Sequence, residues 1–197
     1  MIDKSQTPPL ESLDALTKAA DNLPASHGQI AEILRHIHDY ATDHKPHPMY
    51  VSGLADMASS DGLSKAIIFG WRYLSISGNE RKFAVEVHHD PDGSNHHFAG
   101  LSHGPAVEAL IKVIEDHKIE QQIEIGGFSL STVSIPALDI SAVWLHAAGG
   151  GDDMLAIVPP APSFLKAWPE TYTVQQFEDA IRDEAAQNVE IHRTVFA

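Results

Sequence analysis

The spacing of apolar residues changes near Trp71, and this change limits the folds open to the chain. In the first 43 residues, apolar residues recur every three or four positions, which is typical of amphipathic helices, while residues 49–70 are ambiguous and 63–69 could be a short helix or a strand. Beyond Trp71, apolar residues alternate with polar residues, as in Phe83, Val85 and Val87, and this two-residue period predicts half-buried strands. Separate helical and strand stretches, with short turns between consecutive strands, predict an α+β fold with an antiparallel sheet.

Two amphipathic helices are predicted near the N-terminus, over residues 10–23 and 26–43. Thr7 is placed to cap the first helix, and Ser26 with Gln29 has the spacing of a capping box for the second. Both apolar stripes need a partner surface, because isolated helices of this length are marginal in water. We therefore expect the two helices to form a hairpin that packs on the rest of the chain.

The remainder of the chain is predicted to form strands with two helices among them. The predicted strands cover residues 71–77, 81–89, 96–101, 119–125, 128–135, 140–145 and 154–158, with an edge strand or a tail at 189–196. One helix is predicted from Pro105, and another behind a capping box formed by Thr173 and Gln176. We expect the helices to cover one face of the sheet. The length fits a single domain over 1–197, with 1–45 as its helical hairpin.

The charge balance argues against partners that carry phosphate. The chain has 13 Lys and Arg against 27 Asp and Glu, a formal net charge of −14, and its basic residues are not clustered. Nucleic acids and anionic membranes both favour a basic surface, so neither is expected as a partner, whereas a cationic partner is compatible with this acidic chain. Cysteine is absent, which excludes disulfides and thiol nucleophiles. With no long apolar run and no signal-like N-terminus, we expect a cytoplasmic protein.

A histidine-rich hairpin is the main candidate for metal chemistry. The chain has 13 histidines, and four of them flank an Asp-Pro-Asp-Gly turn. A six-residue loop would place two histidine pairs across the hairpin, at the roughly 4.5–5.5 Å between Cβ atoms of facing residues, where two imidazoles can share a metal ion. The candidate ligands are His88, His89, His96, His97, Asp90 and Asp92. The alternative is an exposed hairpin tip whose histidines titrate freely.

Other motifs do not match known catalytic patterns. Gly127–Ser131 differs from a nucleophile elbow, because Ser131 stands where the final glycine is needed. Gly149–Asp153 is too acidic to bind a phosphate group, and a hairpin loop is the favoured interpretation. Trp168 and Tyr172 are candidates for a ligand or partner surface, because aromatic side chains in a proline-bounded segment often serve that purpose.

No motif in the chain identifies an activity. The sequence favours an intracellular, non-enzymatic binding or protein-interaction module, with no cofactor and with an unknown protein or small-molecule partner. One alternative is a metal-dependent enzyme that holds a divalent transition metal at the histidine-rich hairpin. Another is a carrier with a small-ligand pocket between sheet and helices. A homo-oligomer is compatible with all three hypotheses.

Overall fold

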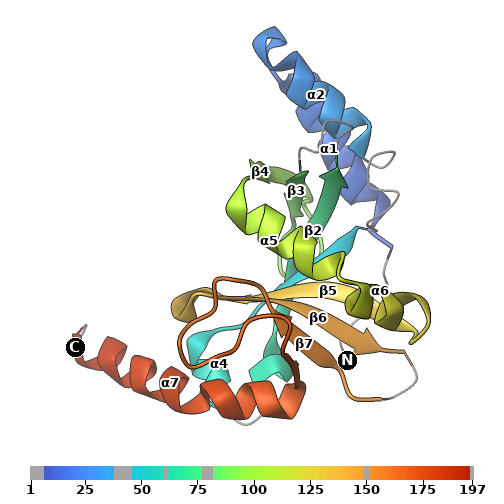
Figure 1. The fold of residues 1–197 in the computed structure, drawn as a ribbon. Coiled ribbons are helices and arrows are strands. Elements are labelled where there is room, and N and C mark those ends of the chain that lie inside the picture. The colour runs from blue at the N-terminus through green and yellow to red at the C-terminus, as the bar shows by residue number, and fades with distance from the viewer. Residues whose placement is uncertain (1–6, 38–45, 60–61, 77–81, 149–150, 196–197) are drawn as a thin grey trace. The chain divides into compact units, whose positions relative to one another are not determined.

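The computed structural model describes residues 7–37, 46–59, 62–76, 82–148 and 151–195 (Figure 1). These residues form helices and antiparallel strand pairs, which confirms the predicted α+β class. The chain divides into two compact units, and each is described by itself. Unit 1 includes Tyr50–Ile67 and Lys112–Ala197, and unit 2 includes Ser5–Met49 and Ile68–Ile111. Whether helices cover one face and whether 1–197 is a single domain stay predictions.

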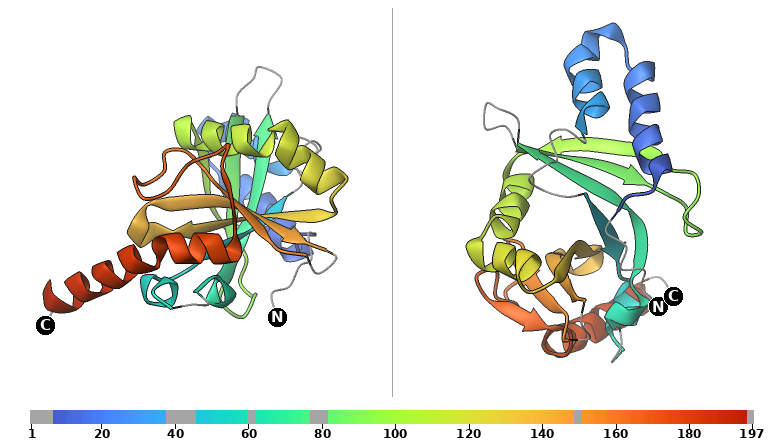
Figure 2. Two further views of the ribbon diagram at one scale, coloured as in Figure 1. Left: turned by 60° about the horizontal axis from the view of Figure 1, so that its bottom comes forward. Right: turned by 90° about the vertical axis from the view of Figure 1, so that its right-hand side faces the viewer.

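Unit 2 begins with the predicted helical hairpin. The helices are α1 (Leu10–Asn22), the short 3-10 helix η1 (Ala25–His27) and α2 (Gly28–Arg35). The right-hand view of Figure 2 shows α1 and α2 side by side. The caps differ from the prediction: Pro9 precedes α1, and neither helix start has a side-chain cap. The Ser26 hydroxyl instead pairs with Nδ1 of His27 at 3.1 Å, and residues 38–43 lie outside the described part of the chain.

The strands of unit 2 follow the hydrogen-bonded order β4-β3-β2-β1. Their bounds are β1 (His47–Val51), β2 (Ile67–Ile76), β3 (Lys82–His88) and β4 (His97–His103). Pairing is antiparallel from β2 to β3 and from β3 to β4, with a bulge between Glu86 and Val87. The three strands predicted between residues 71 and 101 are confirmed, and β2 begins earlier than expected.

The core of unit 2 joins the helical hairpin to the strands. Leu16 of α1 and Leu34 of α2 are buried together with Tyr73 of β2 and Val85 of β3. The alternation of β3 explains this arrangement, because every second side chain points to the same face. The apolar stripes found in the sequence are therefore the surfaces that bury these helices.

β1 crosses the unit boundary, and unit 1 contains the strands that follow it in the hydrogen-bonded order, β5-β6-β7-β8. The strands are β5 (Phe128–Ile135), β6 (Ile140–Ala147), β7 (Met154–Ile157) and β8 (Thr171–Thr173). The helices are α4 (Leu54–Met57), η2 (Gly62–Lys65), α6 (His117–Glu124), η3 (Pro136–Leu138) and α7 (Val174–Val195), while α5 (Pro105–Ile114) crosses the unit boundary. Adjacent strands from β5 to β8 are antiparallel, as predicted.

Two predicted strands of unit 1 are wrong. Residues 119–124 belong to α6 and Ile125 is its C-cap, because Ile119 and Ile123 are four positions apart and the Asp116 carboxylate accepts a hydrogen bond from the Lys118 amide at the helix start. Residues 189–195 continue α7 to Val195 instead of forming an edge strand. The capping box that begins α7 is confirmed: Gln176 accepts from the Thr173 amide at 2.9 Å, and Thr173 accepts from the Gln176 amide at 3.2 Å.

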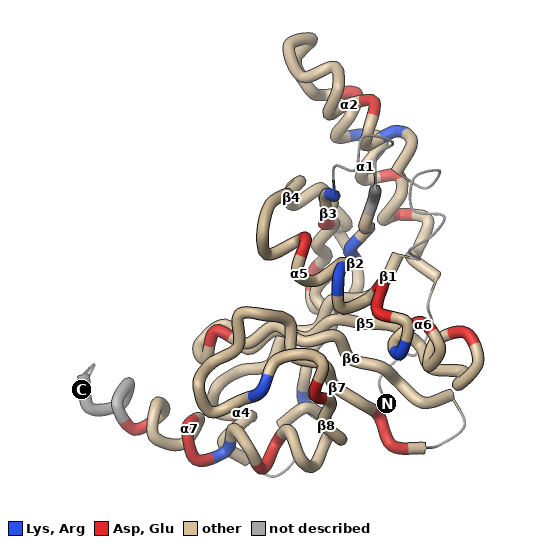
Figure 3. The backbone as a smooth tube through the Cα atoms, in the orientation of Figure 1, with Lys and Arg blue, Asp and Glu red and all other residues tan. Residues whose placement is uncertain are grey.

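Acidic residues lie along α7, as Figure 3 shows. Most of the acidic positions in its described part, such as Asp179 and Asp183, are exposed. Glu184 is half-buried, and Glu178 is buried and accepts a hydrogen bond from the Leu63 amide at 2.8 Å. This bond fixes α7 to η2. None of the described helices is both long and apolar enough to cross a bilayer.

Candidate functional site

Unit 1 brings together a serine, a histidine and an aspartate from three successive parts of the chain. Ser131 lies on β5, His146 lies on β6, and Asp153 immediately precedes β7. The β5–β6 register pairs Ser131 with Trp144, so His146, two residues further along, projects from the same face. We call these three residues the Ser131 relay.

Two short hydrogen bonds connect the Ser131 relay. The Ser131 hydroxyl and Nε2 of His146 are 2.8 Å apart, and Nδ1 of His146 is 2.8 Å from a carboxylate oxygen of Asp153. The other Asp153 oxygen accepts from the Ala147 amide at 2.9 Å. Because an ionised carboxylate only accepts hydrogen bonds, Nδ1 carries a proton and Nε2 faces the serine. This is the order of nucleophile, base and orienting acid in serine hydrolases.

The solvent exposure of the three residues is the reverse of the order that catalysis by the Ser131 relay requires. The Asp153 side chain is 19% exposed, that of His146 is 3% exposed, and Ser131 is fully buried. A nucleophile must reach its substrate, whereas here the acid is nearest to water and the serine is deepest. The Ser131 hydroxyl is also 3.0 Å from the Trp144 carbonyl oxygen, to which it can donate. If Nε2 of His146 donates to the Ser131 oxygen, the Ser131 hydroxyl can donate to that carbonyl instead.

Aromatic rings surround His146. The ring centre of Trp144 is 4.3 Å from that of His146, and the ring centre of Tyr50 is 6.0 Å away. The indole N–H of Trp144 is buried and has no acceptor among the described residues. A buried donor without an acceptor costs about 1–3 kcal/mol, so this position is the least satisfied part of the cluster.

The sequence prediction missed the Ser131 relay. Ser131 was judged only against the nucleophile elbow, and Asp153 only as part of a glycine-rich loop. One signal was present: His146 directly follows the nearly all-apolar predicted strand 140–145, and an imidazole buried there needs hydrogen-bond partners. The identity of those partners depended on strand register, which periodicity does not give.

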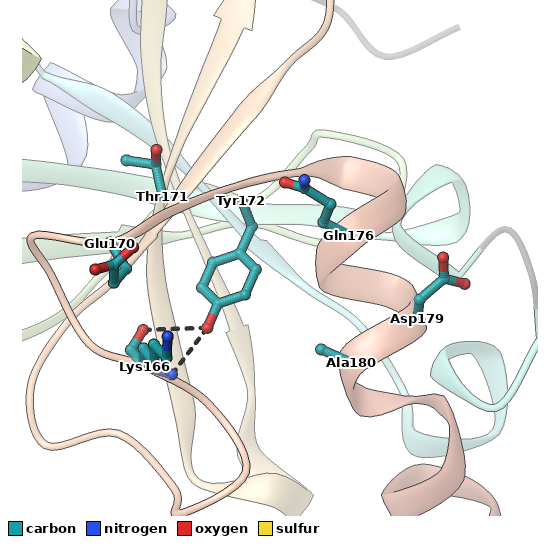
Figure 4. Close-up of a pocket in the computed structure, with 7 residues that line it drawn as sticks. All are labelled: Lys166, Glu170, Thr171, Tyr172, Gln176, Asp179 and Ala180. Atoms are coloured by element: carbon teal, nitrogen blue, oxygen red, sulfur yellow. Dashed lines mark hydrogen bonds between the residues drawn. The ribbon is translucent and has the colours of Figure 1, made fainter.

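A groove in unit 1 contains Tyr172, one of the two residues predicted to form a partner surface. Its volume is about 570 Å³, it is open to solvent, and we call it the Tyr172 groove. Figure 4 shows the Tyr172 ring between Lys166 and the side of α7 that carries Gln176 and Asp179. The Tyr172 hydroxyl accepts from the Lys166 amide at 2.8 Å, so the ring is held in place. Glu170, Thr171 and Ala180 complete the lining.

Trp168, the other predicted partner residue, anchors the loop beside this groove and does not line it. Its amide donates to the Ile157 carbonyl at 2.9 Å, and its indole N–H donates to an Asp116 carboxylate oxygen at 3.2 Å. The Asp116 carboxylate therefore accepts hydrogen bonds both from Trp168 and from the Lys118 amide at the start of α6. The loop that presents Lys166 and Glu170 is fixed at this end.

The histidine-rich hairpin of unit 2 folds in the predicted register. His88 pairs with His97 across β3 and β4, with ring centres 6.1 Å apart, and the ring centres of His89 and His96 are 5.1 Å apart. Burial is the main reason that the pKa of His96 lies below its ordinary value, and the neighbouring His89 adds to the effect. The hairpin therefore presents two histidine pairs.

Both candidate aspartates of the hairpin are engaged in its turn. Asp92 accepts from the amide and the hydroxyl of Ser94 at 2.9 and 2.6 Å, and these bonds lower its pKa. Asp90 accepts from the Asn95 amide group at 2.6 Å. Across the described residues, no three or more His, Asp or Glu side chains are placed to hold one metal ion. Metal binding by the hairpin stays a prediction.

Comparisons with protein-family models, with curated proteins and with solved structures give no significant match, so geometry alone supports the functional proposals.

Proposed function

We propose that the protein is an intracellular, non-enzymatic interaction module that binds a basic, extended peptide segment of a partner protein in the Tyr172 groove. The observation that carries this proposal is the open groove between the Lys166–Glu170 loop and α7, with a fixed aromatic ring inside it. A tyrosine ring held in place by its own hydroxyl offers a contact surface at low entropic cost.

Charge supports a basic occupant. The groove is lined by the carboxylates of Glu170 and Asp179 and by the ammonium of Lys166, and Asp179 is ion-paired with Arg182 at 2.8 Å, which leaves Glu170 as the main attraction for a basic residue within the groove. The whole chain has a formal net charge of −14, which steers cationic partners toward it. An arginine of the partner can also stack on the Tyr172 ring through a cation–π contact.

Shape supports a peptide over a small molecule. Small-molecule sites usually enclose most of the ligand surface, whereas this groove is largely open to solvent. It lies beside β8, which ends the hydrogen-bonded order of strands. Peptides commonly bind in extended form next to such terminal strands. The open shape therefore argues against the alternative of a small-ligand carrier.

Selection from a random peptide library displayed on phage tests the proposal. We expect the selected peptides to be rich in Lys and Arg, and their affinity to fall with added salt because exposed charges are screened. In spectra of isotope-labelled protein, the peptides should shift the amide signals of Tyr172, Gln176 and Ala180. Tyr172→Ala should weaken binding by about tenfold or more, as expected for an aromatic anchor.

A matched pair of variants separates the groove from general acidity. Glu170→Gln and Glu124→Gln each remove one exposed negative charge from unit 1, but only Glu170 lines the groove. The proposal expects weaker peptide binding in Glu170→Gln alone. Equal effects of the two substitutions, or selected peptides that shift no groove signal, would contradict it.

A second candidate function is acyl transfer by the Ser131 relay, which its two 2.8 Å contacts favour. A fluorophosphonate reacts with activated serines, so labelling of the intact protein measures this activity directly. We expect no labelling, because Ser131 is fully buried. Labelling that maps to Ser131 and disappears in His146→Ala would establish the acyl-transfer function instead.

A further inference from the structure

One histidine of each pair in the hairpin of unit 2 has Nδ1 close to a backbone carbonyl oxygen, and for His97 this is the Asn95 carbonyl, at 3.0 Å. Nδ1 of His89 is 2.7 Å from the Asp90 carbonyl oxygen. A carbonyl only accepts hydrogen bonds, so Nδ1 of His89 carries the proton and Nε2 keeps its lone pair. Metal-binding histidines usually make such a bond from their second nitrogen, because it fixes the tautomer and the ring orientation.

His96 supplies a second nitrogen that lacks a partner. Its Nε2 is buried and has no hydrogen-bond partner among the described residues; the same is true of Nε2 of His88, so the ring separation is what distinguishes the two pairs. A buried polar atom in that state is unfavourable, and a bound cation would satisfy its lone pair. Since the imidazole of His96 already lies against that of His89, the two nitrogens belong to neighbouring rings.

The distance between the two rings fits a shared ion. A zinc–nitrogen bond is about 2.0–2.1 Å, and the ring centre lies about 1.1 Å behind the nitrogen, so two imidazoles at the tetrahedral angle have ring centres about 5 Å apart. The observed separation of the His89 and His96 ring centres is 5.1 Å. The 6.1 Å between His88 and His97 would need a nitrogen–metal–nitrogen angle of about 150°, which a tetrahedral ion disfavours.

From these contacts we propose that His89 and His96 form a two-histidine site for one divalent transition-metal ion of the zinc type. The protein supplies two imidazole ligands, and water fills the other positions. The turn beneath the site is braced, because the Asp90 amide donates to the Ser94 carbonyl and the Gly93 amide donates to the Asp90 carbonyl, each at 2.8 Å. The site lies in a different unit from the Tyr172 groove, and neither proposal depends on the other.

Calorimetric titration of the chelator-treated protein with zinc tests this site. We expect one zinc ion per chain with micromolar affinity, since two ligands bind far more weakly than the four of a structural site. Loss of an outer-shell partner alone typically weakens metal binding by about 10–100-fold. His96→Gln, which removes a ligand itself, should therefore weaken binding by at least about tenfold.

The other histidine pair provides the matched control. His97→Gln also removes one hairpin imidazole, but from the pair with the wider separation, and should leave zinc affinity unchanged. Equal weakening in the two variants, or several equivalent weak ions per chain, would overturn the proposal because binding would then be a general property of surface histidines. Circular dichroism melting shows whether each variant is folded.

Histidine nitrogen spectra of the unaltered protein test the site without depending on the folding of any variant. Zinc bound at this site should shift the Nε2 resonances of His89 and His96 in histidine nitrogen spectra, and leave those of His88 and His97 in place. Shifts spread over all four rings would overturn the site, as would shifts confined to His88 and His97.

Discussion

At the scale of single residues, Tyr73 is the clearest example of a polar group controlled by burial. Its side chain is fully buried in the core of unit 2, and its hydroxyl is 2.7 Å from that of Ser12, which is equally buried. Burial disfavours the charged phenolate and raises the pKa of Tyr73 from 10.0 to about 12, while the Ser12 bond partly opposes this shift. One hydroxyl pair thus connects α1 to β2.

This raised pKa predicts a loss of stability at alkaline pH. Between about pH 10 and pH 12 the unfolded chain loses the Tyr73 proton and the folded chain keeps it, so the free energy of unfolding falls as pH rises. A shift of two pKa units corresponds to about 3 kcal/mol. Tyr73→Phe should lack this contribution to the alkaline loss, as measured by urea unfolding at pH 8 and pH 11. If the variant and the parent lose stability equally, Tyr73 is not responsible.

At the scale of elements, close approach between strands restricts β2 more than its hydrophobic pattern suggests. Gly70 pairs with His88, and a Cβ atom added at Gly70 would lie 2.3 Å from the Val87 carbonyl oxygen. Gly100 on β4 pairs with Glu86, and a Cβ atom there would meet nothing within 4 Å. Glycine is therefore required at position 70 of β2 but can be replaced at position 100 of β4.

These two glycines give a matched prediction. Gly70→Ala should lower the free energy of unfolding by about 1–3 kcal/mol or more, because the strand must shift to relieve the clash. Gly100→Ala should be neutral or slightly stabilising, since alanine restricts the unfolded chain. Urea unfolding of both variants measures the difference, and comparable stabilities would mean that β2 tolerates a side chain at position 70.

At the scale of the whole molecule, charge controls solubility. The formal net charge is −14 with neutral histidines, and protonation of all 13 histidines would bring it to about −1. The sequence isoelectric point is about 5.2. Proteins associate most readily when the net charge is near zero.

We therefore expect a solubility minimum near pH 5.2 and high solubility at pH 8. Turbidity of a concentrated sample, followed from pH 8 to pH 5, measures this dependence. Full solubility throughout that range would show that exposed surface chemistry other than net charge keeps the molecules apart.

Local pattern was sufficient wherever neighbouring residues decide the structure. The alternation of Phe83, Val85 and Val87 predicted β3, and the Asp90–Gly93 turn gave the correct pairing of His88 with His97. The Thr173–Gln176 capping box marked the start of α7. Residues 119–125 were wrongly predicted to form a strand. Ile119, Ile123 and Ile125 are separated by four and then two positions, and this spacing fits a strand only if the polar Gln121 is ignored.

The sequence by itself determined the α+β class, most strands and the buried faces of α1 and α2, because periodicity and turn chemistry act over a few residues. Only the tertiary structure decided that Ser131, His146 and Asp153 meet, since contacts between three strand segments depend on register and strand order. The same is true of the Tyr172 groove, which needs the Lys166–Glu170 loop beside α7. Long-range pairing converts separate polar residues into a site, and no local pattern contains that information.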